Sequence, residues 1–138
     1  MATTRPVRVM DPFAREFWEF TEKKELRMQQ CSECKKLRWP AAAVCDKCLS
    51  PDYTWELVSG KGQVLSWIVF HRQYFPEYPA PHPAVAVELA EGPIFVCCMP
   101  EQYQGSDLAD ALPMELDWLE SEDRFGVYNL PVFKPVGK

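Results

Sequence analysis

Near the start of the chain, large aromatic residues recur at helical spacing among charged ones. Asp11-Pro12 is typical of a helix start, because Asp can cap the first turn and Pro fits inside it. The pattern predicts an amphipathic helix from here to about Arg27. Residues 1–10 show no such pattern, and we expect them to form a loose tail. The aromatic stripe of the expected helix contains Phe13, Phe17, Trp18 and Phe20.

In the second half of the chain, the pattern changes to short runs rich in β-branched and aromatic residues, separated by turn signals. The segment 71–83 contains four prolines, which exclude it from a central strand. Short strands at close spacing are typical of a small all-β barrel or sandwich. The expected strands are residues 53–58, 63–70, 84–90, 94–99, 114–120 and 127–133.

Two CxxC pairs lie between the helix and the strands, with ten residues separating one pair from the other. Four thiolates from two such turns suit a tetrahedral Zn²⁺ ion, and two pairs so close together disfavour a redox function. Because four protein ligands leave no position for water, we expect the zinc to be structural. The expected ligands are Cys31, Cys34, Cys45 and Cys48. The chain then divides into a tail with a helix (1–28), a zinc ribbon (29–52) and a barrel (53–138).

Composition and charge exclude several classes of protein. With 138 residues and 47% apolar content, the chain is a globular domain of ordinary size. No apolar run approaches a membrane span, and no secretory signal is visible, so we expect a cytoplasmic protein without a membrane partner. Residues 1–50 hold 10 Lys/Arg and 7 Asp/Glu, whereas residues 51–138 hold 5 and 13. The acidic second part would repel a phosphate backbone, which argues against nucleic acid as a partner.

Two groups of aromatic residues are candidates for a partner interface. For the helix stripe, packing on the chain's own core and docking of a partner both remain open. The Pro-rich loop carries Tyr74, Phe75 and Tyr78. Such a loop favours a shaped contact surface, although a crossover packed against the barrel wall is the alternative.

No set of catalytic residues is recognisable, and we expect none. For His71, at the start of the Pro-rich loop, a surface role is favoured over that of a general base. Cys97 and Cys98 are adjacent in an expected strand, so their side chains point to opposite faces and do not easily share a metal. We expect both cysteines to act as small apolar residues.

The order of motifs from about residue 12 to residue 135 resembles the DUF35 family. Beyond the four cysteines, the motifs are Phe17-Trp18-Glu19, Trp55 with Val58-Ser59-Gly60-Lys61-Gly62, His71-Arg72, Val87-Glu88-Leu89 with Glu91-Gly92-Pro93, and Leu130-Pro131-Val132-Phe133. The chain departs from the family pattern at residues 108–114, which leaves the start of the last but one strand open. The resemblance implies an N-terminal helix, a rubredoxin-like zinc ribbon and a small OB-fold barrel.

The resemblance also implies a non-catalytic accessory subunit. Such a subunit would bind and stabilise a thiolase-superfamily catalytic subunit in a heterotetramer or larger complex, and would help to position acyl-CoA as a shared substrate. The partner would supply the chemistry, either retro-aldol cleavage, as in steroid side-chain degradation, or Claisen-type acyl transfer. Candidate contacts with acyl-CoA are Lys35, Lys36, Arg38, His71 and Arg72. A solvated charged surface is the alternative for the three ribbon residues.

Two other functions stay open. Zinc ribbons and OB barrels both occur in nucleic-acid-binding modules, which the acidic second part disfavours. A small independent enzyme would use His71 or a strand cysteine, and that thiol would need an activating base.

Overall fold

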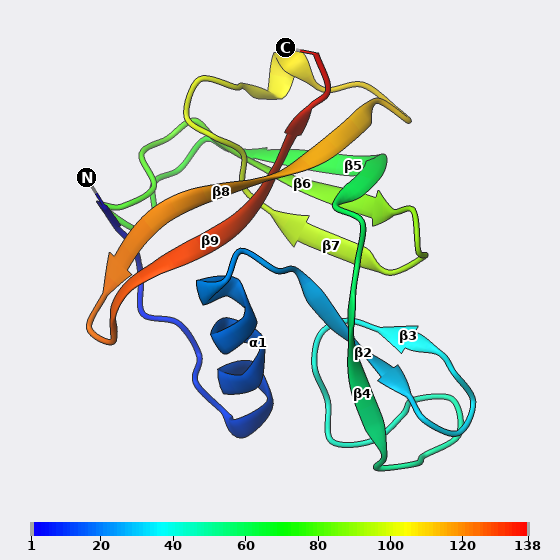
Figure 1. The fold of residues 1–138 in the computed structure, drawn as a ribbon. Helices are drawn as coiled ribbons and strands as arrows, with labels where there is room; N and C mark the ends of the chain where they lie inside the picture. Colours follow the sequence, from blue (N-terminus) through cyan, green and yellow to red (C-terminus); the bar gives the residue numbers. More distant parts are fainter. Residues whose placement is uncertain (1, 138) are drawn as a thin grey trace.

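The computed structural model describes residues 2–137 and folds them into one α-helix and two β-sheets (Figure 1). Residues 1 and 138, which the expected tail and barrel include, lie outside the described residues. A three-stranded sheet forms the ribbon, and a six-stranded sheet forms most of the remainder. Figure 1 shows the helix below the six-stranded sheet, with the ribbon beside it. The expected mainly β fold with an N-terminal helix is confirmed.

Helix α1 spans Pro12–Glu22, and the Asp11 side chain caps it by accepting the Ala14 N–H at 2.8 Å. We expected the helix to reach about Arg27, but it ends five residues earlier. Lys24 has a φ of 57°, a left-handed conformation that ends the helix. Leu26 and Met28, which follow two residues apart, are both buried, and this spacing is the period of a strand.

The ribbon sheet has a central strand, β2 (Arg27–Cys31), which pairs antiparallel with β3 (Leu37–Arg38) and β4 (Tyr53–Leu57). β4 therefore belongs to the ribbon, whereas the sequence analysis placed residues 53–58 in the barrel. Period-2 patterning identified the strand but carries no information about its partner.

The six-stranded sheet has the order β1-β8-β5-β6-β7, with β9 paired to the other side of β8. Pairing is antiparallel except between β1 and β8, which run parallel. A short 3₁₀ helix, Gly105–Asp107, precedes β8. The strands are β1 (Thr3–Thr4), β5 (Lys61–Phe70), β6 (His82–Leu89), β7 (Ile94–Cys97), β8 (Pro113–Asp123) and β9 (Gly126–Pro135).

The Pro-rich segment 71–83 was excluded from a central strand, yet β6 begins at His82 and contains Pro83. Pro83 pairs with β5 only, because the pairing between β6 and β7 begins at Val85. A proline near the start of a strand that lacks a partner on one side does not interrupt the ladder.

Two glycines shape the turn between the ribbon and the large sheet. Gly60 has a φ of 77°, which other residues adopt at a cost. A Cβ on Gly62 would lie 2.5 Å from the Glu88 carbonyl oxygen and 2.7 Å from Val87 Cγ1. The missing side chain at Gly62 therefore lets β5 approach β6 closely where the sheet begins.

A line of aromatic rings connects the three parts of the fold. The Phe17 side chain of α1 is 3% exposed, and its ring centre lies 4.6 Å from that of Trp39 in the ribbon. Trp39 lies 5.2 Å from Phe95 of β7, which lies 5.9 Å from Phe133 of β9. The helix, the ribbon and the large sheet thus share one core.

The prediction of a loose N-terminal tail is wrong for residues 3–8, which are held by contacts with β8. Thr3 and Thr4 pair with Ser121 and Glu122 of β8. Arg8 Nε then donates to Asp123 Oδ2 at 2.8 Å, and the side chain of Asp123 is inaccessible to solvent. These pairings are long-range, and sequence patterning does not detect a two-residue strand.

We predict that the Arg8–Asp123 ion pair stabilises the fold in a pH-dependent way. The Arg8 side chain lowers the pKa of Asp123 to about 2. A carboxyl with a depressed folded-state pKa adds stability above its unfolded pKa, and this stability is lost as the pH falls from about 4 towards 2. At pH 7, Asp123→Asn is expected to lower the free energy of unfolding by about 2 kcal/mol.

Urea unfolding at several pH values measures this effect, and Asp117→Asn is the matched control. Asp117 is 38% exposed and lies 3.6 Å from Lys134 Nζ, so its loss is expected to change little. The difference between wild type and Asp123→Asn should shrink below about pH 4. Equal losses in both variants at pH 7 would contradict the prediction.

Candidate functional site

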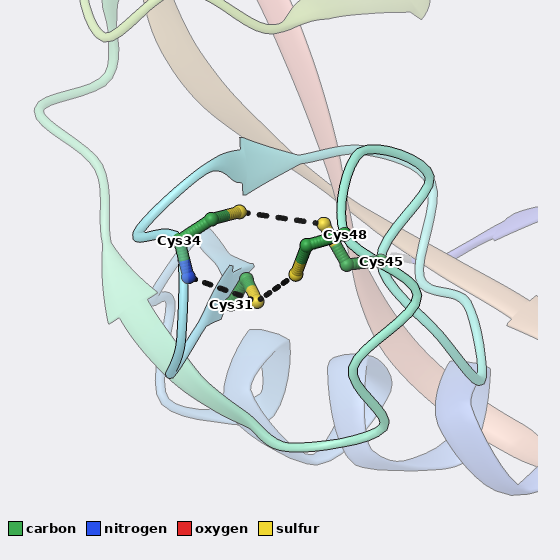
Figure 2. A group of neighbouring side chains, drawn as sticks. All are labelled: Cys31, Cys34, Cys45 and Cys48. Atoms are coloured by element: carbon green, nitrogen blue, oxygen red, sulfur yellow. Dashed lines mark hydrogen bonds between the residues drawn. The ribbon is translucent and has the colours of Figure 1, made fainter.

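The two CxxC turns have matching backbone geometry and face each other (Figure 2). In each turn, the residue after the second cysteine has a φ of 65° and donates its N–H to the carbonyl of the first cysteine. Lys35 does so to Cys31 at 3.0 Å, and Leu49 does so to Cys45 at 2.9 Å. The chain therefore builds two equivalent loops that present their thiols to one point. These thiols belong to Cys31, Cys34, Cys45 and Cys48.

The four sulfur atoms fit a single tetrahedral metal ion. All lie within 4.8 Å of one another, and the Sγ atoms are 3.5 Å apart for Cys31 and Cys48 and 3.6 Å apart for Cys34 and Cys45. A tetrahedron with metal–sulfur bonds of about 2.3 Å has edges of about 3.8 Å. The donor set is all thiolate and closed, which suits a structural site.

Backbone amides in these turns favour the thiolate form. The Cys34 N–H points to Cys31 Sγ at 3.5 Å, and the Lys47 N–H points to Cys45 Sγ at 3.4 Å. Hydrogen bonds from the Cys48 and Lys47 amides lower the pKa of Cys45 to about 6, and the Cys34 amide lowers the pKa of Cys31. Deprotonated sulfur is the form that binds a metal.

The structure places the aromatic stripe of α1 against the chain's own core and not on a free face. Phe17 is buried, and the other three rings are half-buried. Phe13 packs on Tyr53, Phe20 packs on Trp55, and Trp18 packs on Tyr128. Of the two readings that the sequence left open, internal packing is the one that the geometry favours.

The aromatic residues of the Pro-rich loop divide into two groups. Tyr74 and Phe75 are 65% and 53% exposed. Tyr78 is half-buried and stacks on His82, with ring centres 4.6 Å apart. The outer part of the loop is therefore available for contact, and its inner part is packed on β6.

Beside this loop, the outward face of β5, β6 and β7 carries a patch of exposed apolar side chains that sequence reasoning missed. Cross-strand pairs place Ile68 beside Ala84, and Ala86 beside Val96. Ile68 is 56% exposed and Val96 is 64% exposed. The sequence predicted these strands from their residue types and short length, but which of their positions face outward depends on the sheet register. We call this patch the β5–β7 face: Ile68, Phe70, Ala84, Ala86, Ile94 and Val96.

The expected basic contacts with acyl-CoA do not form one site. Arg38 is 6% exposed, and its Nε donates to Gln29 Oε1 at 2.9 Å, so Arg38 is a structural residue of the ribbon. Lys36 Nζ lies 2.6 Å from Asp46. His71 and Arg72 are exposed at the far end of β5 from the ribbon (Figure 1).

The cysteines outside the metal cluster are poor nucleophiles. Burial raises the pKa of both Cys97 and Cys98, which keeps them as neutral thiols at neutral pH. His71 is exposed on the loop. Burial lowers the pKa of His82, and the nearby Arg5 lowers it further. Among the described residues, none of these groups is hydrogen-bonded to another as a nucleophile–base pair would be.

Three cavities meet around Tyr78 and His82. The largest, about 610 Å³, lies between α1 and the large sheet and is lined mainly by apolar and aromatic side chains. A second of about 290 Å³ contains Arg5, and a third of about 410 Å³ lies under the exposed loop aromatics.

Within residues 2–137, every helix is too short or too polar to cross a membrane.

Comparison with known proteins matches two parts of the chain to domain families. Residues 18–54 match a family described as "ChsH2, rubredoxin-like zinc ribbon domain", and residues 55–102 match "ChsH2, C-terminal OB-fold domain". One solved structure, titled "Ltp2-ChsH2(DUF35) aldolase", is 33% identical, with a TM-score of 0.81, over 95% of this chain and 98% of that chain. The chain belongs to the DUF35 family. The expected fold, a zinc ribbon followed by an OB-fold, is thereby confirmed.

Two further relatives extend the comparison of this DUF35 chain. A "Probable enoyl-CoA hydratase alpha subunit" of Thermomonospora curvata is 35% identical over 120 residues, which are 86% of this chain and 36% of that protein. The chain thus spans about a third of the length of that curated relative. A DUF35 protein of unknown function from Sulfolobus solfataricus has a TM-score of 0.59 at 14% identity, over 76% of this chain and 77% of that chain, which shows a shared fold.

We predict that the DUF35 ribbon depends on a bound metal. Cys45→Ser removes one of four ligands, so bound metal should fall from about one ion per chain to well below that. Because metal-binding energy in such a site is folding energy, the melting temperature should fall as well. Atomic emission spectroscopy and thermal melting measure the two effects. Cys98→Ser, outside the cluster, is the control, and full metal content in Cys45→Ser would contradict the prediction.

Proposed function

We propose that this DUF35 chain is a non-catalytic accessory subunit that binds and stabilises a thiolase-like subunit and helps to position its acyl-CoA substrate. The main support for this proposal is the structural similarity, over 95% of this chain, to a chain of the Ltp2–ChsH2(DUF35) aldolase. The likeness to an enoyl-CoA hydratase subunit also supports an acyl-CoA substrate. The complex is a heterotetramer or larger, and the partner performs carbon–carbon bond chemistry, either retro-aldol cleavage or Claisen-type acyl transfer.

The metal in this proposal is a structural Zn²⁺ ion held by the four ribbon cysteines. Its all-sulfur, closed coordination supports zinc over the harder cations, which prefer oxygen. When bound, the ion cross-links the two CxxC turns. The ribbon then holds Trp39 and Trp55 in place against α1.

The docking surface in this proposal is the β5–β7 face together with Tyr74 and Phe75 of the adjacent loop. Phe70 connects the two, because its ring lies 6.2 Å from that of Tyr74. The face ends at β7, which pairs only with β6 among the described strands. Contiguous apolar side chains beside an unpaired strand edge favour contact with another protein. The aromatic stripe of α1 is not needed for this contact.

Acyl-CoA contact in this proposal lies at the loop and not at the ribbon. Arg72 is exposed and its guanidinium lies 5.4 Å from the ring centre of Tyr74. It is therefore held at the edge of the docking surface, where a CoA phosphate could pair with it. Lys35 is exposed in the ribbon, and the nearby Lys36 is paired with Asp46.

No observation favours the nucleic-acid alternative. The outward-facing positions paired across β5, β6 and β7 carry apolar side chains with Gln63, Ser66, His82 and Glu88, and none of them is Lys or Arg. A single-strand binding groove requires basic and stacking side chains along its length.

We predict that Val96→Asp weakens the complex without unfolding the chain. Val96 is 64% exposed in the free chain, so the change should leave melting unaltered. In the complex, the new charge would be desolvated, which should weaken association at least about tenfold, or about 1.4 kcal/mol. Co-purification with a co-expressed thiolase-like subunit, followed by titration calorimetry, measures the effect.

Val136→Asp is the matched control for this experiment. Val136 is 50% exposed and follows β9, away from the β5–β7 face. Unchanged affinity in Val96→Asp would remove the β5–β7 face from the proposal. Failure of the wild-type chain to form a complex would overturn the proposed function itself.

For acyl-CoA, we predict that Arg72→Ala raises the KM of the complex several-fold and changes kcat little, because the residue contacts a remote part of the substrate. Arg124→Ala is a matched control, since its guanidinium lies 5.0 Å from the ring centre of Phe125 in a comparable exposed pair. Steady-state kinetics of the intact complex with an acyl-CoA substrate measure both variants. An equal KM for Arg72→Ala and wild type would contradict the contact.

A further inference from the structure

Arg5 is a buried charge without a counter-ion. It is 7% exposed, and its Nε makes no hydrogen bond. Among residues 2–137, no carboxylate lies within ion-pair distance of its guanidinium. Its backbone N–H donates to the Glu122 carbonyl at 2.9 Å, which fixes the main chain at this residue.

This arrangement is unfavourable unless something else pairs with the side chain. A guanidinium stays protonated at any physiological pH, and a buried charge without a partner strongly destabilises a fold. The Tyr78 ring, 5.2 Å from Arg5 Cζ, compensates part of the charge. The Tyr78 hydroxyl also interacts with the Arg5 side chain, but it carries no charge, and the buried Nε of Arg5 still has no acceptor.

The Arg5 side chain lines the cavity of about 290 Å³. Among the described residues that line it, Arg5 is the only Lys or Arg, and Glu77 and Glu101 are the only acidic residues. His82 has a lowered pKa because of burial and of Arg5, so it is neutral at neutral pH. The Cys98 thiol, whose pKa burial raises, is neutral as well. The cavity thus has one fixed positive charge, and it lies on Arg5.

An apolar cavity adjoins this charged one. The cavity of about 610 Å³ shares Tyr78, His82 and Cys98 with the cavity of Arg5. The same three side chains therefore form the wall between an apolar chamber and the chamber that contains Arg5. A ligand that fits both chambers has an apolar body and a negatively charged end.

We propose that Arg5 binds the carboxylate of a small organic acid whose apolar body occupies the neighbouring cavity. A guanidinium matches a carboxylate through two parallel N–H donors. Glu77 and Glu101 line the same cavity and repel any anion, so the single charge of a carboxylate is tolerated better beside Arg5 than the double charge of a phosphate dianion. This site is separate from the metal centre and from the β5–β7 face, and it does not rest on the proposed function.

Octanoate is the probe, and the metal-loaded full chain is the protein. The NMR resonance of the Arg5 Nε–Hε group reports binding, and it is assigned by its absence from the spectrum of Arg5→Lys. In wild type, we expect this resonance to shift as octanoate is added and to stop shifting when the site is saturated. Methyl octanoate, which has no charge, and inorganic phosphate are expected to leave it unmoved at the same concentration. An unmoved resonance with octanoate, or an equal response to either of the other two compounds, would overturn the proposal.

Variants separate the site from general binding of fatty acids. Arg5→Met is expected to weaken octanoate affinity at least about tenfold in titration calorimetry, whereas Arg15→Met, at an exposed arginine of α1, should bind as wild type does. If Arg5→Met does not fold, the wild-type resonance decides the question alone. Equal affinity in a folded Arg5→Met would overturn the proposal.

Discussion

The burial of Phe17 is the contact on which the rest of the structure depends. This one ring, from a short helix, meets Trp18 and the two ribbon tryptophans Trp39 and Trp55. Through Trp39, the contact continues to Phe95 of the large sheet. Neither a three-stranded ribbon nor an 11-residue helix buries enough apolar surface to be stable alone. Each part therefore completes the core of the others, and the chain folds as one unit although it consists of two recognisable domains.

Polar contacts around this core fix the angle between helix and ribbon. The Glu16 carboxylate accepts from the Tyr53 hydroxyl at 2.9 Å and from Trp55 Nε1 at 2.6 Å. Both donors lie on β4, the strand that leads from the metal-binding loops into the large sheet. The cysteine cluster thus helps to hold α1 in place, because it stabilises the ribbon strands that carry these two donors. The ribbon also lines a cavity together with Ile94 of the β5–β7 face, so a structural metal there supports one margin of the docking surface.

Features that arise within a few residues could be predicted from the sequence, whereas pairings between distant strands could not. The CxxC spacing identified the cysteine cluster, and the Asp11-Pro12 start located the helix, because both signals arise within a few residues. The same reasoning extended the helix too far, since burial of Leu26 and Met28 outweighs helical propensity there. It also left Thr3 and Thr4 as a tail and missed the β5–β7 face. Those features depend on which strand lies beside which, and on the register between them, which hydrophobic period alone does not encode.

The stacked rings of Tyr78 and His82 have a consequence for how the molecule responds to its surroundings. They line all three cavities, including the one beneath Phe75 in the exposed loop. Anything that displaces this pair from one side changes the room left on the other two. If binding at one of these places displaced the pair, binding at the others would change too, and each event would alter the affinity of the other by the same factor.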